Sequence, residues 1–192
     1  TNPFGTATSN AATLTVGTAP AVTTQPVDQN AIVGASPTFS VSATGTAPLS
    51  YQWQKDGSNI TGATSSSYTI ENVQIDANGT TYRCYITNKY GNITSSSATL
   101  AVGYVPAFAS HPADADRILG SGYTFSVSLS EGTEPISYQW KKDGTDISGA
   151  NSASYTIEVL SAEDEGVYSC IASNVFGAAT SNTATLTVGI PP

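Results

Sequence analysis

The chain has 192 residues, of which 39% are hydrophobic and only 10% are charged, and this composition excludes a disordered acidic polypeptide. Its six basic and fourteen acidic residues, a formal net charge of -8, leave no basic patch for binding nucleic acid. The chain has one His and two Cys, too few for a metal site, and we predict no metal and no cofactor. No apolar run approaches the ~20 residues of a membrane helix, so we also predict no membrane span in this segment.

The first 16 residues repeat a later part of the chain. TNPFGTATSNAATLTV, residues 1–16, aligns with TNKYGNITSSSATLAV, residues 87–102. We therefore interpret residues 1–17 as the C-terminal strand or strands of a preceding repeat, in a window cut from a longer array. A second interpretation stays open, in which Leu14 and Val16 belong to an edge strand that completes a neighbour's sheet and builds a polymer. Both complete repeats already contain the equivalent strand, so we favour the first interpretation.

Two complete repeats follow, at residues 18–103 and 104–189. YQWQKDGSNITGATSSSYTIENV at residues 51–73 reappears as YQWKKDGTDISGANSASYTIEVL at residues 138–160. Each repeat has the length of one small domain. Residues 190–192 resemble the junction between the two complete repeats, and we interpret them as the start of a next linker or repeat.

Apolar and polar residues alternate within each repeat. Tyr82, Cys84 and Ile86, for example, are separated by single polar or outward residues. This period of two is typical of strands with one buried face. The Asp-Gly pairs at residues 56–57 and 143–144 predict tight hairpin turns, and no stretch shows a helical apolar stripe. Short strands at regular spacing indicate an antiparallel β-sandwich in each repeat.

Each repeat also contains a Trp followed by a Tyr-x-Cys motif: Trp53 with Tyr82 and Cys84, and Trp140 with Tyr168 and Cys170. These residues resemble the strand C Trp and the strand F Tyr-x-Cys of immunoglobulin-like domains. DEGVYSC at residues 164–170 carries the full D-x-G-x-Y-x-C pattern, which the first repeat carries with a displacement of one residue. The chain thus resembles the tandem I-set-like repeats of bacterial-type extracellular surface proteins.

The resemblance implies an all-β chain of tandem antiparallel Greek-key β-sandwiches, arranged as a linear rod. It also implies that Tyr82 and Tyr168 are tyrosine-corner residues, whose hydroxyl groups bond to nearby backbone. The implied location is extracellular or at the cell surface.

One feature departs from the family pattern. Phe39 and Phe125 occupy the strand B positions that usually hold a second Cys, so neither repeat can form the usual disulfide. A buried Phe contributes about 1.5–3 kcal/mol, similar to the roughly 2–4 kcal/mol of a disulfide, so we expect folding without the bridge. We expect Cys84 and Cys170 to behave as small buried hydrophobes. The expected core residues are Phe39, Trp53, Tyr82 and Cys84, and Phe125, Trp140, Tyr168 and Cys170.

The titratable residues offer no convincing reactive site. His111 aligns with Gln25 of the first repeat, and we expect a structural role because a general base needs partners. Residues 18–103 carry three basic and four acidic side chains, whereas residues 104–189 carry three basic and ten acidic ones. A calcium site at Glu163-Asp164-Glu165, or in the first-strand region at Asp114 and Asp116, stays an alternative. Solvated positions, with Asp164 capping its turn, are favoured since no D-x-D-x-D-G loop exists.

Three Asn-x-Ser/Thr sequons lie in the first repeat and would accept glycans if the host glycosylates them: Asn59, Asn78 and Asn92. Tyr85, Tyr90 and Phe176 could anchor a sugar or a protein. For these three aromatic residues we favour packing against a neighbouring domain.

The linkers are short, with about three residues between Val102 and Pro106, too few for a flexible tether. We therefore expect a non-catalytic structural or adhesive segment of a stalk, filament or adhesin that acts as a semi-rigid spacer. Its partners would be the neighbouring repeats, other copies of the chain in a fibre, or a surface protein or glycan. A carbohydrate- or protein-binding accessory module of a secreted enzyme, and a strand-donating fibre subunit, are the alternatives. No acid/base pair or nucleophile constellation supports an enzyme.

Overall fold

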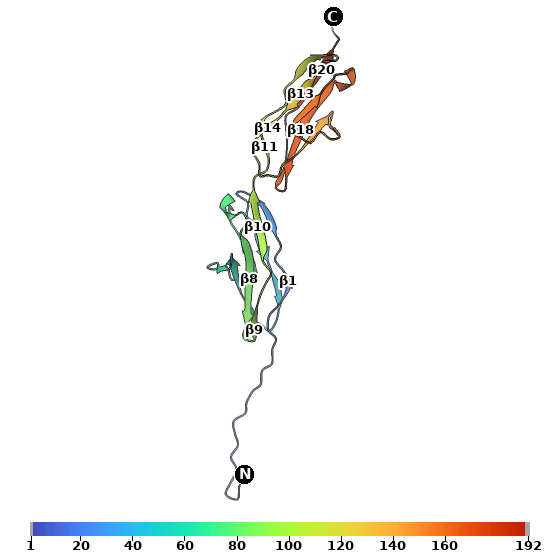
Figure 1. The fold of residues 1–192 in the computed structure, drawn as a ribbon. Coiled ribbons are helices and arrows are strands. Elements are labelled where there is room, and N and C mark those ends of the chain that lie inside the picture. The colour runs from blue at the N-terminus through green and yellow to red at the C-terminus, as the bar shows by residue number, and fades with distance from the viewer. Residues whose placement is uncertain (1, 191–192) are drawn as a thin grey trace. The chain divides into compact units, whose positions relative to one another are not determined.

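The computed structural model describes residues 2–190, and its strands are drawn in Figure 1. Residues 2–17 precede the first sandwich, and the side chains of Phe4, Leu14 and Val16 are 96%, 88% and 83% exposed. The expectation for residues 190–192 falls largely on residues outside the described part. Among the described residues, no helix has the length and apolarity that a bilayer-crossing segment would need.

The first sandwich consists of short strands and one turn of 3-10 helix. In chain order they are β1 (Ala21–Thr24), β2 (Gln29–Ile32), β3 (Thr38–Ser40), β4 (Ser42–Thr44), β5 (Ser50–Lys55), β6 (Ser58–Asn59), β7 (Ser67–Thr69), η1 (Ile75–Ala77), β8 (Thr81–Asn88), β9 (Gly91–Thr94) and β10 (Ala98–Gly103). The larger sheet has the order β2-β10-β8-β5-β6, with β9 also paired to β8.

The second sandwich repeats this plan. Its elements are β11 (Ala107–Ser110), β12 (Ala115–Ile118), β13 (Tyr123–Ser126), β14 (Ser128–Glu131), β15 (Ser137–Lys142), β16 (Thr145–Asp146), β17 (Ser154–Ile157), η2 (Ala162–Asp164), β18 (Gly166–Asn174), β19 (Gly177–Thr180) and β20 (Ala184–Gly189). Its larger sheet has the order β12-β20-β18-β15-β16, while β11 pairs with β14 and β13 with β17. The expectation of two all-β sandwiches is confirmed.

The antiparallel expectation needs one amendment in each sandwich. The first strand of each repeat divides at a Pro, and its second half joins the larger sheet parallel to the last strand: β2 lies parallel to β10, and β12 to β20. Pro26 and Pro112 stand at the two divisions. Because Pro lacks an amide hydrogen and fixes φ, it ends one ladder and lets the chain cross to the other sheet.

The Asp-Gly pairs form tight turns between β5 and β6 and between β15 and β16. Asp56 and Gly57 have φ of 48° and 83°, and Asp143 and Gly144 have φ of 50° and 81°. Two successive positive φ angles belong to the turn type whose twist matches that of the flanking strands.

Aromatic rings fill the space between the sheets. Trp140 is 0% exposed, and the Phe125 ring stacks on Tyr168 with centroids 4.4 Å apart. In the first sandwich Trp53 is also 0% exposed, and Phe39 stacks on Tyr82 at 4.7 Å. Each Phe at a strand B position is therefore packed within the aromatic core of its sandwich, against Trp and Tyr rings.

Candidate functional site

The two thiols are held away from solvent. Cys84 and Cys170 are free and both are 0% exposed. Burial raises the pKa of Cys170 to about 11, with a backbone hydrogen bond at Gln139 acting in the opposite direction, and burial raises the pKa of Cys84 as well. A thiol that stays protonated and inaccessible at neutral pH is not a nucleophile, so these residues serve packing.

His111 occupies a structural position. Its Nδ1 accepts a hydrogen bond of 3.0 Å from the backbone amide of Asn182. In the first sandwich the Gln25 Oε1 accepts the equivalent bond, 2.8 Å long, from the amide of Ser96. Both side chains therefore link the bend after the first strand to the loop that precedes the last strand, and an imidazole and a carboxamide can each accept this bond.

Polar groups of the acidic turn before β18 form hydrogen bonds within the turn and to neighbouring side chains. The Asp164 carboxylate accepts hydrogen bonds from the amide and the hydroxyl of Ser161, 2.8 and 2.7 Å long. The Tyr168 hydroxyl donates to the carbonyl of Asp164 at 2.7 Å, which is the bond expected of a tyrosine corner. Lys142 donates to the carbonyl of Glu163. Within residues 2–190, no group of three or more His, Cys, Asp or Glu side chains is placed to hold a metal ion.

The three sequons lie at exposed positions in the first sandwich. Asn59 lies in β6, where its Oδ1 accepts a bond from Gln54 Nε2. Asn92 lies in β9, and Asn78 follows η1, where its Oδ1 accepts the Val102 amide at 2.9 Å. The exposure of all three is compatible with modification, and their occupancy stays a prediction.

Where each linker enters its sandwich, two polar side chains of that sandwich form hydrogen bonds to the backbone of the linker residue. Thr133 and Tyr104 form two hydrogen bonds. The Tyr104 amide donates to the Thr133 hydroxyl at 2.9 Å, and the Thr133 amide donates to the Tyr104 carbonyl at 3.1 Å. Asn174 Nδ2 then donates to the carbonyls of both Tyr104 and Thr133, each at 2.8 Å. The linker residue is thereby held by the loop that contains Thr133 and by Asn174 at the end of β18.

The first sandwich has the same joint around Thr18. The Thr18 amide donates to the Thr46 hydroxyl at 2.8 Å, and Asn88 Nδ2 donates to the carbonyls of Thr18 and Thr46, each at 2.8 Å. We call this set of bonds the linker clamp, formed by Thr46 and Asn88 in one copy and by Thr133 and Asn174 in the other.

An aromatic ring covers the glycine before each clamp. A Cβ placed on Gly103 would lie 2.3 Å from a Phe176 ring atom, and one on Gly17 would lie 2.0 Å from the Tyr90 ring. Only glycine leaves room for such an approach. The rings of Tyr90 and Phe176, which we expect to pack against a neighbouring domain, lie against Gly17 and Gly103, the glycines that precede Thr18 and Tyr104.

Sequence reasoning did not identify the clamp, although the signal was available. Asn-x-aromatic-Gly occurs at residues 2–5, 88–91 and 174–177, and Gly-Thr precedes a Pro at residues 45–48 and 132–135. The Asn in each motif also accepts an amide two residues later, at 2.9 Å in all three copies.

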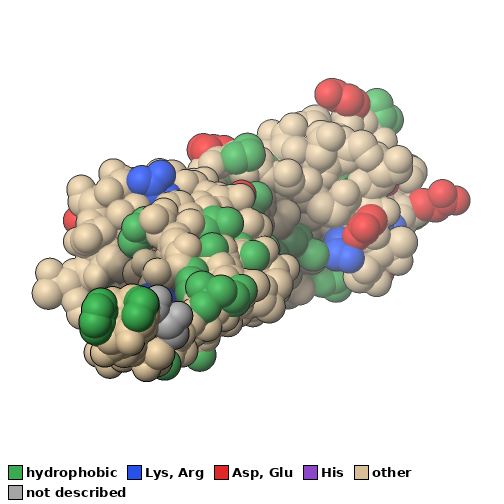
Figure 2. All heavy atoms as spheres, turned by 90° about the horizontal axis from the view of Figure 1, so that it is seen from below, with side chains coloured by type: hydrophobic (Ala, Val, Ile, Leu, Met, Phe, Trp, Pro, Cys, Tyr) green, Lys and Arg blue, Asp and Glu red, His purple; other side chains and the backbone are tan. Residues whose placement is uncertain are grey.

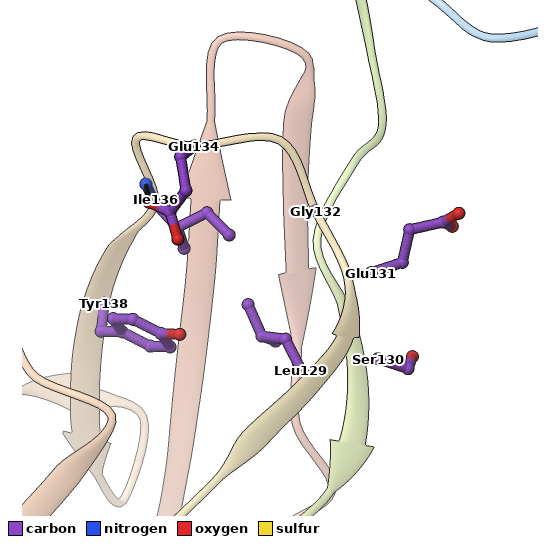
Figure 3. A pocket seen from close by; sticks show the side chains of 7 residues that line it. All are labelled: Leu129, Ser130, Glu131, Gly132, Glu134, Ile136 and Tyr138. Carbon is purple, nitrogen blue, oxygen red and sulfur yellow. Dashed lines mark hydrogen bonds between the residues drawn. The ribbon is translucent and has the colours of Figure 1, made fainter. Parts of the chain in front are cut away.

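A shallow hollow of about 380 Å³ lies in the second sandwich between β14 and β15 (Figure 3). Its lining residues are Leu129, Ser130, Glu131, Gly132, Glu134, Ile136 and Tyr138. Tyr138 and Ile136 have counterparts in Tyr51 and Leu49 of the first repeat, whereas Leu129 and Glu134 align with Ala43 and Ala47.

Family models match both repeats. The immunoglobulin I-set domain model matches residues 20–102, and an immunoglobulin domain model matches residues 106–174. The chain is a tandem pair of immunoglobulin domains. We therefore call the two sandwiches the first and second immunoglobulin domains.

Relatives of the pair come from animals and from a bacterium. The chain is 29% identical to mouse leucine-rich repeats and immunoglobulin-like domains protein 3, over 88% of the chain and 18% of that protein. It is also 29% identical to endoglucanase C of Cellulomonas fimi, over 92% of the chain and 17% of that enzyme. The chain thus spans less than a fifth of these relatives, and they do not single out the expected bacterial type of protein.

Among solved structures, an I-band fragment of titin matches with a TM-score of 0.63 and 27% identity, covering 90% of this chain and 66% of the fragment. Extracellular domains 3–5 of Drosophila OTK match with a TM-score of 0.74 and 23% identity, covering 88% of this chain and 62% of that one. The second likeness shows the fold alone.

Proposed function

We propose that this tandem pair is a non-catalytic structural or adhesive segment of a longer extracellular protein, and that it acts as a semi-rigid spacer. The observation that carries the proposal is the linker clamp. A spacer has to restrict the orientation of one domain relative to the next. A linker that is hydrogen-bonded to the following domain restricts this orientation more than a free tether does.

The clamp restrains the linker in two ways. Tyr104 has both of its backbone polar groups engaged, and the ring of Phe176 leaves no room for a side chain at Gly103. Val105 lies within 3.1 Å of a Cβ placed on Gly177, so the next residue is enclosed as well. Each restraint reduces the backbone freedom that would let a three-residue connection bend.

Composition and domain organisation support an extracellular setting. Charged residues are scattered among uncharged groups on the face seen in Figure 2, as suits a soluble exposed segment. Neither copy depends on a disulfide, so the proposed extracellular setting rests on the composition and on the tandem immunoglobulin organisation.

We further propose that residues 18–103 and 104–189 are the two units of the spacer and that residues 1–17 end a preceding repeat. The turn at residues 2–5 supports this, since Asn2 and Gly5 exchange backbone bonds of 2.9 and 3.1 Å. The alternative of a strand donor would use the same residues, whose large apolar side chains are exposed.

An accessory module of a secreted enzyme is the second candidate function. It is favoured by the match to endoglucanase C, which covers 92% of this chain. A glycan-array screen of the tandem pair separates the two functions, because micromolar binding to a glycan supports the accessory module and its absence supports the spacer.

Amide relaxation measured by NMR tests the spacer. We expect both domains to report one common rotational correlation time in the native chain. Replacing Asn174 with Ala and Thr133 with Val removes the side-chain half of the second clamp and should give two shorter, separate times. The matched replacements Asn88→Ala and Thr46→Val, which alter the clamp at residue 18, should leave the common time unchanged. Separate times in the native chain would rule the spacer out.

A further inference from the structure

One arginine of the first immunoglobulin domain carries a charge that no acidic residue of the described chain neutralises. Arg83 lies in β8 between the buried residues Tyr82 and Cys84, so its half-buried side chain points to the outer side of the sheet. Among residues 2–190, the one ion pair joins two residues of the second domain and leaves Arg83 without a carboxylate.

Two carboxamides hold this guanidinium in place. Arg83 Nε donates to Gln54 Oε1 at 2.8 Å, and Gln54 Nε2 donates to Asn59 Oδ1 at 2.8 Å. Gln54 also lies directly opposite Arg83 in the register of β5 and β8. Because Nε is engaged, the two Nη groups form the edge that remains for a ligand. Two parallel N–H donors of this kind match the two oxygens of one carboxylate.

The acidic residue of the adjacent turn is engaged by other donors. A Cβ placed on Gly57 would lie 3.7 Å from Arg83 Nη2, which puts the guanidinium beside the turn between β5 and β6. Asp56, in that turn, accepts the amide and the hydroxyl of Thr81 at 2.8 and 3.1 Å. A carboxylate that pairs with the Nη groups is therefore supplied by another molecule or by a part of the protein outside the described residues.

The second domain neutralises the equivalent position internally. In the repeat alignment, Lys141 and Asp146 replace the two carboxamides, and Ser169 replaces the arginine. Lys141 Nζ lies 2.6 Å from Asp146 Oδ1. The same place on the same strands thus holds a closed ion pair in one domain and an open, oriented cation in the other. A ligand that recognises the cation should distinguish the two domains.

The side chains beside Arg83 are of the kinds that contact sugars. Tyr85 lies two positions further along β8 on the same side of the sheet, with Gln52 opposite it in β5 and Thr94 opposite it in β9. An aromatic ring offers a flat apolar surface with a polar hydroxyl at its edge. The carboxamide and the hydroxyl add neutral donors and acceptors. This combination suits a pyranose, which has an apolar face and a rim of hydroxyl groups.

A protein is the less suitable occupant of this surface. Protein interfaces depend on large side chains that become buried at their centre. The exposed large aliphatic side chains of the first domain are Val27, Ile32 and Ile75, and none of them lies in β5, β8 or β9. The polar character of these strands therefore favours an acidic sugar over an acidic protein segment.

We propose that the first domain binds a carboxylated sugar of the uronate class on the outer side of β5, β8 and β9. The Nη groups of Arg83 take the sugar carboxylate, and the ring of Tyr85 lies against the pyranose. This site goes beyond the spacer function and does not rest on it, because the linker clamp consists of other side chains.

The test is a titration of the tandem pair with methyl glucuronide and with methyl galacturonide, followed by amide chemical shifts. With at least one uronide we expect saturable shifts at residues 52–59 and 83–94, and none at residues 139–146 and 169–180 of the second domain. Methyl glucoside and methyl galactoside, which lack the charge, should bind roughly fivefold more weakly, the upper size of a solvent-exposed ion pair. No saturable shift with either uronide, or equal affinity for the neutral sugars, would overturn the proposal.

Single substitutions separate recognition at this site from the general charge of the domain. Arg83→Gln should weaken uronide binding roughly fivefold, and Arg83→Lys should weaken it too, because an ammonium does not offer two parallel N–H donors. Lys89→Gln removes the same charge from the exposed turn after β8 and should change the affinity by less than about twofold. Equal losses in the two glutamine variants would contradict a site at Arg83.

The compound acetyl-glutamate-amide tests the source of the carboxylate. It presents the same group as a protein side chain would, without a sugar ring. We expect it to bind more weakly than the better uronide, and we expect Tyr85→Ala to reduce this difference because the ring contact is lost. Equal binding of the glutamate compound and the uronide would assign the site to an acidic protein segment and refute the sugar.

Discussion

At the scale of single residues, the two copies act as controls for each other. Within the described part of the chain, the hydroxyl of Tyr90 is buried and has no hydrogen-bond partner. The second domain has Phe176 at this position, and residues 2–5 have Phe4. A buried polar group without a partner costs roughly 1–3 kcal/mol.

Replacing Tyr90 with Phe should therefore stabilise the first domain by about 1 kcal/mol, because the ring stays and the unpaired hydroxyl leaves. Chemical denaturation followed by the amide signals of residues 18–103 measures the stability of the first domain separately from that of the second. The reverse change, Phe176→Tyr, should destabilise the second domain. A stability loss in Tyr90→Phe would mean that the hydroxyl makes a favourable contact.

Cys170 links the stability of the second domain to alkaline pH. Below pH 9 the thiol is protonated in both the folded and the unfolded chain, so its contribution is constant. Above that value the unfolded thiol ionises while the folded thiol, with its pKa raised to about 11 by burial, stays protonated. The unfolding free energy should consequently fall as the pH rises from 9 to 11.

The variant Cys170→Ala isolates this dependence. It lowers stability at every pH through lost packing, but its unfolding free energy should fall less steeply between pH 9 and 11 than that of the native chain. Urea titrations at a series of pH values give both slopes, and parallel slopes would contradict the assignment to this thiol.

At the scale of elements, sequence patterns predicted most of what positions the core. The alternation through Tyr82, Cys84 and Ile86 matches the buried face of β8, and the Asp-Gly pairs form the turns. The parallel pairing of β2 with β10 was not predicted, because a period of two does not tell which neighbour a strand has. The clamp was missed because it consists of single bonds between loops far apart in the sequence.

The bend between β11 and β12 offers a matched test of one such bond. His111→Gln should leave the second domain as stable as the native form, since Gln25 makes the equivalent bond in the first domain. His111→Ala leaves the Asn182 amide without this acceptor and should cost about 1 kcal/mol. Thermal unfolding measures both, and equal losses in the two variants would argue against the shared role.

At the scale of the whole molecule, the glycine before each clamp decides how closely a ring can approach the linker. A Cβ on Gly103 would lie 2.3 Å from Phe176, nearer than any real contact. Gly103→Ala should therefore displace the ring and loosen the connection, which amide relaxation would detect as two correlation times.

Phe176→Ala alone should also loosen the connection, but adding it to Gly103→Ala should have little further effect, since both changes act on one contact. Additive loosening in the double variant would show that glycine and ring act separately.

The bonds that the two copies of the clamp share engage only the main-chain oxygen and nitrogen of Thr18 and Tyr104, and the Thr18 hydroxyl adds a 3.4 Å bond to the Thr46 hydroxyl in the first copy. The shared bonds consequently do not depend on the side chain of the joining residue. Recombination can duplicate, delete or exchange gene segments that encode such units without changing the hydrogen bonds between linker and clamp, provided that each unit keeps its own Thr, Asn and aromatic residue. A protein assembled in this way can change its reach in evolution by whole increments while every joint stays chemically the same.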